Sequence, residues 1–155
     1  MDVTQQIELA KAEESARRDE ARRRYWIVLA AVANGDTISA ENRATLMADA
    51  KRLGHENAVK YHAEAVAKLV AARKALIPLS SRNFTEESTA LAADGAEIDR
   101  IYLKFLKETH TPRMVPWITR RDELQQAKSK RSSLTGQVED LLMTLTAEGM
   151  PAEII

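Results

Sequence analysis

The sequence brings histidine and glutamate together at His55-Glu56, seven residues before His62. Zinc metalloproteases place two histidines four residues apart on one helix, with a glutamate between them. The spacing of seven does not fit that signature, and the sequence places His55 near a helix start and His62 on the flank of the same helix. We therefore expect ordinary surface histidines and not metal ligands. The third histidine, His110, stands alone in a predicted loop.

Other patterns of catalytic residues are missing from the sequence. The absence of cysteine excludes disulfides, thiolate metal sites and a cysteine nucleophile. The five glycines are scattered, so there is no phosphate-binding loop, and no serine elbow is present. We predict that the chain is not an enzyme and that it has no catalytic, cofactor-binding or metal-binding residues. A pocket lined by Trp26, Tyr61 or Tyr102 would indicate a ligand site, although such aromatic residues are usually part of a core.

The elements that would position any site are helices that pack around residues 25–33. In this run the only polar side-chain groups are the Tyr25 hydroxyl and the Trp26 indole N–H. A helical segment that is apolar on every face must be covered on more than one side. At ~1.5 Å per residue the run spans about half of a ~30 Å bilayer core, so we predict a buried helix centre. With no secretory signal and no membrane span, we expect a cytoplasmic protein.

The composition predicts the fold class. Apolar residues make up 45% of the chain, aromatic residues only 5%, and strand-type alternation is absent. These features predict an all-α fold, a helical bundle of about five helices whose first and last helices are coiled-coil-like. We divide the chain into a charged helical extension, a compact helical core and a long heptad-patterned helix, at residues 1–24, 25–108 and 113–148.

Helix start and stop signals separate the predicted helices. Gly35 and Gly54 are expected to end the first two, and loops are expected at 78–83 and 109–116. Ser39 and Thr85 are candidate N-caps. Gly95, inside the fourth predicted helix, indicates either a close helix contact or a bend.

The last predicted helix has the clearest periodicity, with apolar residues at alternating steps of three and four. Arg120 and Arg131 interrupt this seam, and they would help to fix its register if acidic partners such as Glu14 faced them. We predict that the seam at 117–145 is an interaction surface formed by Trp117, Leu124, Arg131, Leu134, Val138, Leu141 and Leu145.

Charge is distributed unevenly over the same helix. Residues 113–131 hold six basic and two acidic side chains, whereas residues 139–155 hold four acidic and no basic ones. The helix macrodipole favours the opposite order. An antiparallel partner in a two-fold dimer would match the two halves. The alternative is a solvated face on which charges are unevenly spread.

Together these patterns predict a non-enzymatic helical protein-protein interaction or assembly protein, which self-associates through 117–145 or binds another helical protein. Short capped helices joined to charged heptad stretches are similar to those of many small helical proteins from bacteria and bacteriophages, including particle and assembly components. The alternative is nucleic-acid binding by the basic clusters Arg17–Arg24 and Arg120–Arg131. Against it, Asp19 and Glu20 interrupt the first cluster, and the formal net charge is zero.

Overall fold

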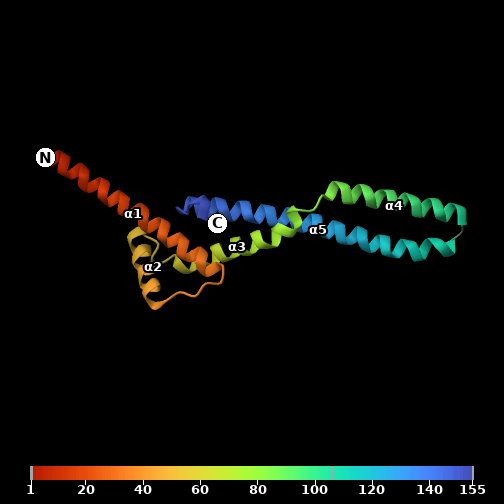
Figure 1. Ribbon diagram of the computed structural model, residues 1–155, viewed down its shortest axis with the longest axis horizontal. Helices are drawn as coiled ribbons and strands as arrows, with labels where there is room; N and C mark the ends of the chain where they lie inside the picture. The colour runs from red at the N-terminus through yellow and green to blue at the C-terminus, as the bar shows by residue number, and fades with distance from the viewer. Residues whose placement is uncertain (1, 106, 155) are drawn as a thin grey trace. The chain divides into compact units, whose positions relative to one another are not determined.

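A computed structural model describes residues 2–105 and 107–154, and within these residues the chain forms five α-helices, a short 3-10 helix and no strand (Figure 1). The predicted all-α class with about five helices is confirmed. Within the same residues, no helix is both long and apolar enough to cross a bilayer. The elements are α1 (Val3–Ala33), α2 (Ala40–Leu53), α3 (Val59–Ser80), α4 (Phe84–Phe105), α5 (Lys107–Ala147) and η1 (Ala152–Ile154).

The chain divides into two compact units, and both α3 and α5 contribute residues to each. Unit 1 contains Met1–Arg73 and Gln137–Ile155, and unit 2 contains Lys74–Gly136. The boundaries of these units do not coincide with the predicted ranges 1–24, 25–108 and 113–148.

Several helix ends follow the predicted signals. The first two helices stop directly before Asn34-Gly35 and Gly54, and Ser39 caps α2 by accepting a 3.1 Å hydrogen bond from the Asn42 N–H. The predicted cap Thr85 is wrong, because α4 begins at Phe84 and Asn83 accepts a 3.1 Å hydrogen bond from the Glu86 N–H. Thr85 therefore already lies in the first turn, where a cap cannot be.

The predicted loop at 109–116 is also wrong. The helix α5 begins at Lys107 and includes Pro112 and Pro116, so His110 is likewise helical. A proline inside a helix removes one N–H donor and crowds the carbonyl four residues earlier. The local preference of proline is therefore overridden here, and Trp117, directly after the second proline, packs against α4. The loop at 78–83 is shorter than predicted, because α3 includes Pro78 and ends at Ser80.

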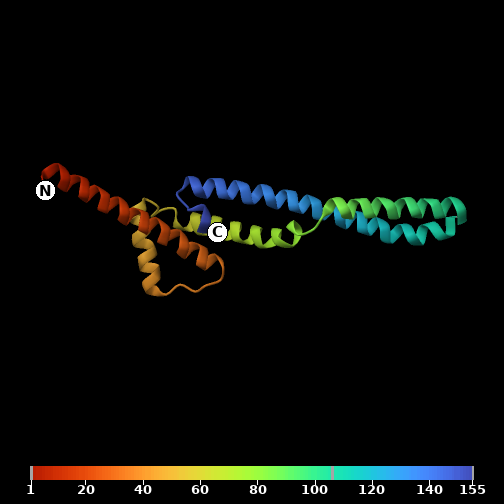
Figure 2. The ribbon, with the colours of Figure 1, turned by 45° about the horizontal axis from the view of Figure 1, so that its top comes forward.

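Unit 1 is organised around the predicted apolar run of α1. Tyr25 and Trp26 are completely buried, which confirms that the run is a buried helix centre. The cover is incomplete, however, because Ile27 and Val32 remain exposed. The carboxyl-terminal part of α5 lies along α3 in both views (Figures 1 and 2). The other buried apolar residues of this unit include Leu29, Leu46, Ala50, Leu53, Val66, Leu69, Leu145 and Met150.

Unit 2 is a helical hairpin in which α4 and the first part of α5 run side by side (Figures 1 and 2). Phe84, Leu91, Leu124 and Ala127 form its buried core, with Trp117 packed against them. The Trp117 indole N–H donates a 2.8 Å hydrogen bond to the Leu91 carbonyl. A Cβ atom built on Gly95 would lie 2.9 Å from Trp117 Cζ2. Gly95 therefore marks a close helix contact, the first of the two predicted alternatives.

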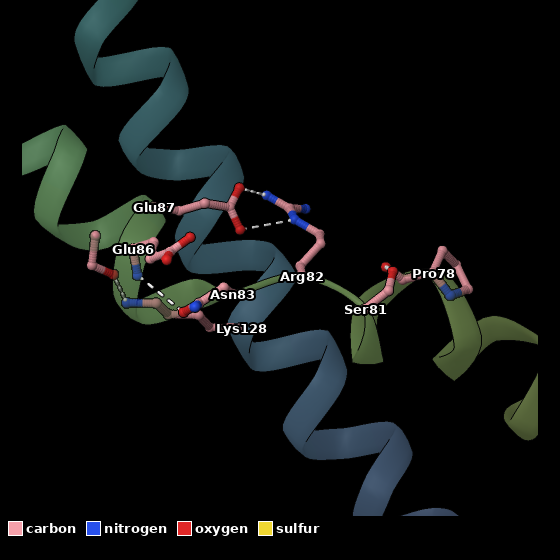
Figure 3. A network of polar contacts seen from close by, with 8 residues as sticks. Pro78, Ser81, Arg82, Asn83, Glu86, Glu87 and Lys128 are labelled. Carbon is pink, nitrogen blue, oxygen red and sulfur yellow. Dashed lines mark hydrogen bonds and ion pairs between the residues drawn. The ribbon is translucent and has the colours of Figure 1, made fainter.

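An ion pair fastens the turn between α3 and α4 (Figure 3). Arg82 donates two hydrogen bonds to the Glu87 carboxylate, of 2.6 and 3.1 Å, and its guanidinium carbon lies 5.1 Å from the centre of the Phe84 ring. Lys128 of α5 reaches the same end of α4, where it donates to the Ser88 hydroxyl. The hydrogen bonds from Arg82 lower the pKa of Glu87 below its ordinary value of 4.5.

Gly95→Ala should destabilise the hairpin by about 1–3 kcal/mol, because the new methyl group must displace the Trp117 ring. Gly136→Ala is the matched control, since a Cβ there would meet nothing within 4 Å. In the control, alanine should stabilise the helix by up to about 1 kcal/mol. Urea unfolding of both variants measures the difference. Equal stability of the two variants would show that the Gly95 contact is not tight.

Glu87→Gln should destabilise the chain near neutral pH and much less near pH 2. Because the folded-state pKa of Glu87 is depressed, the ion pair stabilises the fold above the unfolded pKa of the carboxyl group, and this stabilisation is lost as pH falls through the folded pKa. Urea unfolding at about pH 7 and about pH 2 measures the effect, with Glu86→Gln as the neighbouring control. A penalty for Glu87→Gln that does not change with pH would contradict this assignment.

Candidate functional site

The cluster of side chains best suited to chemistry lies within unit 1. It consists of Tyr25, Trp26, His55, His62 and Glu148, which we call the histidine cluster. Helix α1 supplies the two aromatic residues and α3 supplies His62. His55 lies in the turn between α2 and α3, and Glu148 directly follows α5. Four separate segments therefore build one site.

Two glycine stops place the residues at the edge of the cluster. Gly54 has a φ of +77°, which lets the His55 N–H turn back and donate a 2.8 Å hydrogen bond to the Ala50 carbonyl. Gly149 has a φ of +103°, and the Met150 N–H donates in the same way to the Leu145 carbonyl at 3.0 Å. Such left-handed ends are favourable only for glycine, and they fix the chain direction after a helix. His55 and Glu148 are each next to one of these stops.

His62 is the centre of the cluster. Its side chain is fully buried, and its Nδ1 lies 2.7 Å from the Tyr25 hydroxyl oxygen, within hydrogen-bond distance. The His62 ring is 4.8 Å from the Trp26 ring and 4.8 Å from the His55 ring, and it is nearly perpendicular to the latter. Its Nε2 lies 3.6 Å from Glu148 Oε2, which is too far for a hydrogen bond and would be an ion pair only with a protonated imidazole.

The surroundings favour neutral forms of the buried groups. Burial lowers the pKa of His62, the nearby His55 lowers it further, and Glu148 opposes both effects. Burial also raises the pKa of the Tyr25 hydroxyl, with a smaller contribution from the charge of Glu148. A neutral imidazole carries one N–H and one lone pair. Tyr25 engages Nδ1, so the remaining hydrogen-bonding capacity of His62 is at Nε2.

That Nε2 atom is buried and has no hydrogen-bond partner. The indole Nε1 of Trp26 is in the same state. Buried polar atoms without a partner are uncommon in folded proteins and call for a physical reason. Here the Nε2 atom of His62 faces the carboxylate of Glu148, which is 44% exposed. One polar atom in the core is thus directed towards a group that reaches solvent.

The prediction that both histidines lie on the surface is wrong. His62 is completely buried and His55 is partly buried. Their spacing of seven residues, about two helical turns, does allow a shared face, and this was the one available signal. Glu148 could not be found in this way, because it lies far along the chain. Tyr61, named as a pocket residue, is exposed, and the side chain of Tyr102 lies outside the described residues.

The predicted interaction seam is largely covered by its own chain. Leu124 is buried in unit 2, and Val138 and Leu145 are buried in unit 1. The remaining seam residues are partly buried: Trp117, Arg131, Leu134 and Leu141. The structure therefore brings the seven residues into two separate cores and does not gather them on one free surface.

The charge asymmetry of α5 has partners within the chain. In unit 2, α4 carries five acidic and two basic residues, and the basic part of α5 lies beside it, with Arg120 2.8 Å from Asp94. Beyond the end of α5, Glu153 of η1 pairs with Arg23 at 3.3 Å in unit 1. The basic part of α5 thus has an acidic helix beside it within its own unit.

Both arginines of the seam have contacts within unit 2. Arg120 pairs with Asp94, and the Arg131 guanidinium carbon lies 4.1 Å from the centre of the Phe84 ring. Glu14 instead lies 3.8 Å from Arg17, one turn along its own helix.

Carboxylates also engage much of the predicted basic cluster at residues 17–24. Arg24 donates two hydrogen bonds, of 2.7 and 2.8 Å, to the buried Asp49, and Arg22 pairs with Asp19 at 3.1 Å. These pairings leave less free positive charge for a phosphate backbone than the sequence indicates.

Neither the sequence nor the structure matches a known protein family, a curated protein or a solved structure. The geometry of the chain is therefore the only basis for a functional inference.

Tyr25→Phe should destabilise unit 1 by about 1–3 kcal/mol, because it leaves His62 Nδ1 buried without a partner. Tyr61→Phe makes the same chemical change at a side chain that is 54% exposed, and it should have little effect. Urea unfolding of the two variants provides the comparison. If both lose equally little stability, the hydrogen bond between Tyr25 and His62 contributes nothing.

Proposed function

We propose that the chain is a non-enzymatic helical interaction protein that pairs with a second copy of itself through the amino-terminal part of α1. We call residues 3–20 the arm. Every residue of the arm is exposed, and in both views it extends beyond α2 and the carboxyl-terminal segment of the same unit (Figures 1 and 2). This exposed, continuous helix is the observation that carries the proposal.

Local interactions stabilise the arm as a helix. Asp2 and Gln5 form a reciprocal capping box, in which the Gln5 N–H donates to the Asp2 carboxylate at 2.8 Å. Arg17 lies 3.8 Å from both Glu13 and Glu14, one turn earlier. Such contacts add only about 0.2–0.5 kcal/mol per pair, so the arm gains little from its own unit and remains free to pack elsewhere.

The arm also presents apolar groups to solvent. Val3 is 69% exposed and Ile7 is 50% exposed, and with Ala10 they follow the three-and-four spacing of a coiled-coil seam. Glu14 and Arg17 continue the same stripe as polar positions. A short, partly polar seam of this kind favours a weak helical partner and fixes its register.

Charge favours a second copy as that partner. Residues 2–14 hold four acidic and one basic side chain, whereas residues 15–24 hold five basic and two acidic ones. In an antiparallel pair, the acidic half of each α1 helix would lie against the basic half of the other. The 117–145 seam is less suitable as the pairing surface, because Leu124, Val138 and Leu145 are already buried.

Light scattering on a sizing column should give the mass of a dimer for the full chain at low salt, and a shift towards monomer on dilution or at high salt. Ile7→Asp should weaken the dimer at least tenfold, because it places a charge in the seam. Met143→Asp is the matched control, since Met143 is 72% exposed but lies outside the arm. It should leave the mass unchanged.

A charge exchange tests the orientation. Changing Glu8, Glu13 and Glu14 to Lys should abolish pairing, and changing Arg17, Arg18 and Arg22 to Glu in the same chain should restore it. Circular dichroism confirms that the variants remain helical. A monomeric natural chain at every concentration, or an unchanged dimer in Ile7→Asp, would refute the proposal.

A further inference from the structure

We propose that His55, His62 and Glu148 form a binding site for a divalent transition-metal ion of the zinc type. One ligand atom from each residue can be chosen so that all three lie within 4.8 Å of one another. The independent observation is the Nε2 atom of His62, which is buried, has no hydrogen-bond partner and faces the Glu148 carboxylate. Two imidazoles and one carboxylate are a common ligand set for catalytic zinc.

Binding requires the three ligand atoms, which lie within 4.8 Å of one another, to move closer together. Zinc binds imidazole nitrogen and carboxylate oxygen at about 2.0–2.2 Å in tetrahedral geometry, which places neighbouring ligand atoms ~3.3 Å apart. The Nε2 atom of His62 is 3.6 Å from Glu148 Oε2, close to that value. His55 is partly buried and Glu148 is partly exposed, so both side chains have room to adjust around the fixed ring of His62.

Tyr25 supplies the outer partner that a metal-binding histidine needs. Histidines that bind metals usually engage their second ring nitrogen in a hydrogen bond, which fixes the tautomer and the orientation of the ring. The Tyr25 hydroxyl lies 2.7 Å from Nδ1 and can accept its proton in a hydrogen bond. In that tautomer, Nε2 carries a lone pair that a metal ion lying between it and Glu148 could accept.

The ligand types select the class of ion. Imidazole suits zinc, copper, nickel and iron, whereas calcium and magnesium prefer oxygen ligands alone. Metal binding needs the neutral form of each imidazole, because only a ring nitrogen without a proton can bind the ion. The exposed side of Glu148 leaves a path for the ion and for a water ligand. A bound ion would join the turn before α3, α3 itself and the segment after α5 within unit 1.

Titration of the full chain with Co²⁺ tests the site, because tetrahedral cobalt gives visible absorption bands and Zn²⁺ should displace it. We expect one equivalent to bind. His55→Ala and Glu148→Gln should each weaken binding at least tenfold, and neither changes a fully buried side chain. His110→Asn is the matched control, since it removes the remaining histidine of the chain and should leave binding unchanged.

Thermal unfolding with and without Zn²⁺ provides a second readout. Zn²⁺ should raise the Tm of the natural chain and of His110→Asn, and the same Zn²⁺ concentration should raise the Tm of His55→Ala and Glu148→Gln less. Failure of the natural chain to bind either ion would overturn the proposal. Equal affinity in His55→Ala, Glu148→Gln and the natural chain would do the same, because the ion would then bind elsewhere. Both results are independent of self-association by the arm.

Discussion

The contact between Tyr25 and His62 is the constraint on which unit 1 depends. Both polar side chains are fully buried in unit 1, and each needs a partner there because water is excluded. Their 2.7 Å contact fixes α1 against α3, while Trp26 packs on the same imidazole. With α1 and α3 in this contact, His55 after α2 and Glu148 after α5 lie next to the His62 ring. The packing of the core and the geometry of the histidine cluster are thus one arrangement.

The sequence predicts best those features that local physics decides. The apolar run at 25–33, the cap Ser39 and the stop at Gly54 each depend on neighbouring residues, and the structure agrees with them. Prediction from the sequence failed where contacts between distant residues determine the local structure. Pro112 and Pro116 signal a loop, but they lie within α5. His62 looks like a flank residue, and only the assembled helices show that it is buried beside Glu148. Glu148, which lies far along the chain, could not be inferred from spacing.

The uneven charge of α5 shows how a tertiary contact can replace an expected intermolecular one. A basic stretch followed by an acidic stretch indicates a second copy when the helix is considered alone. In unit 2 the basic stretch lies beside the acidic α4, and Arg120 pairs there with Asp94. All residues of the arm are exposed, and its exposed Val3 and Ile7 are the basis of the proposed pairing.

The position of the histidine cluster depends partly on residues that contribute no side chain to it. Gly54 and Gly149 hold backbone conformations that other residues rarely adopt, and each directs the chain next to a cluster member. The geometry of the cluster therefore depends both on the contacts between its side chains and on the backbone conformation at its edge. A designer who transferred only the five side chains to another helical scaffold would leave out the two glycine helix ends that help to place them.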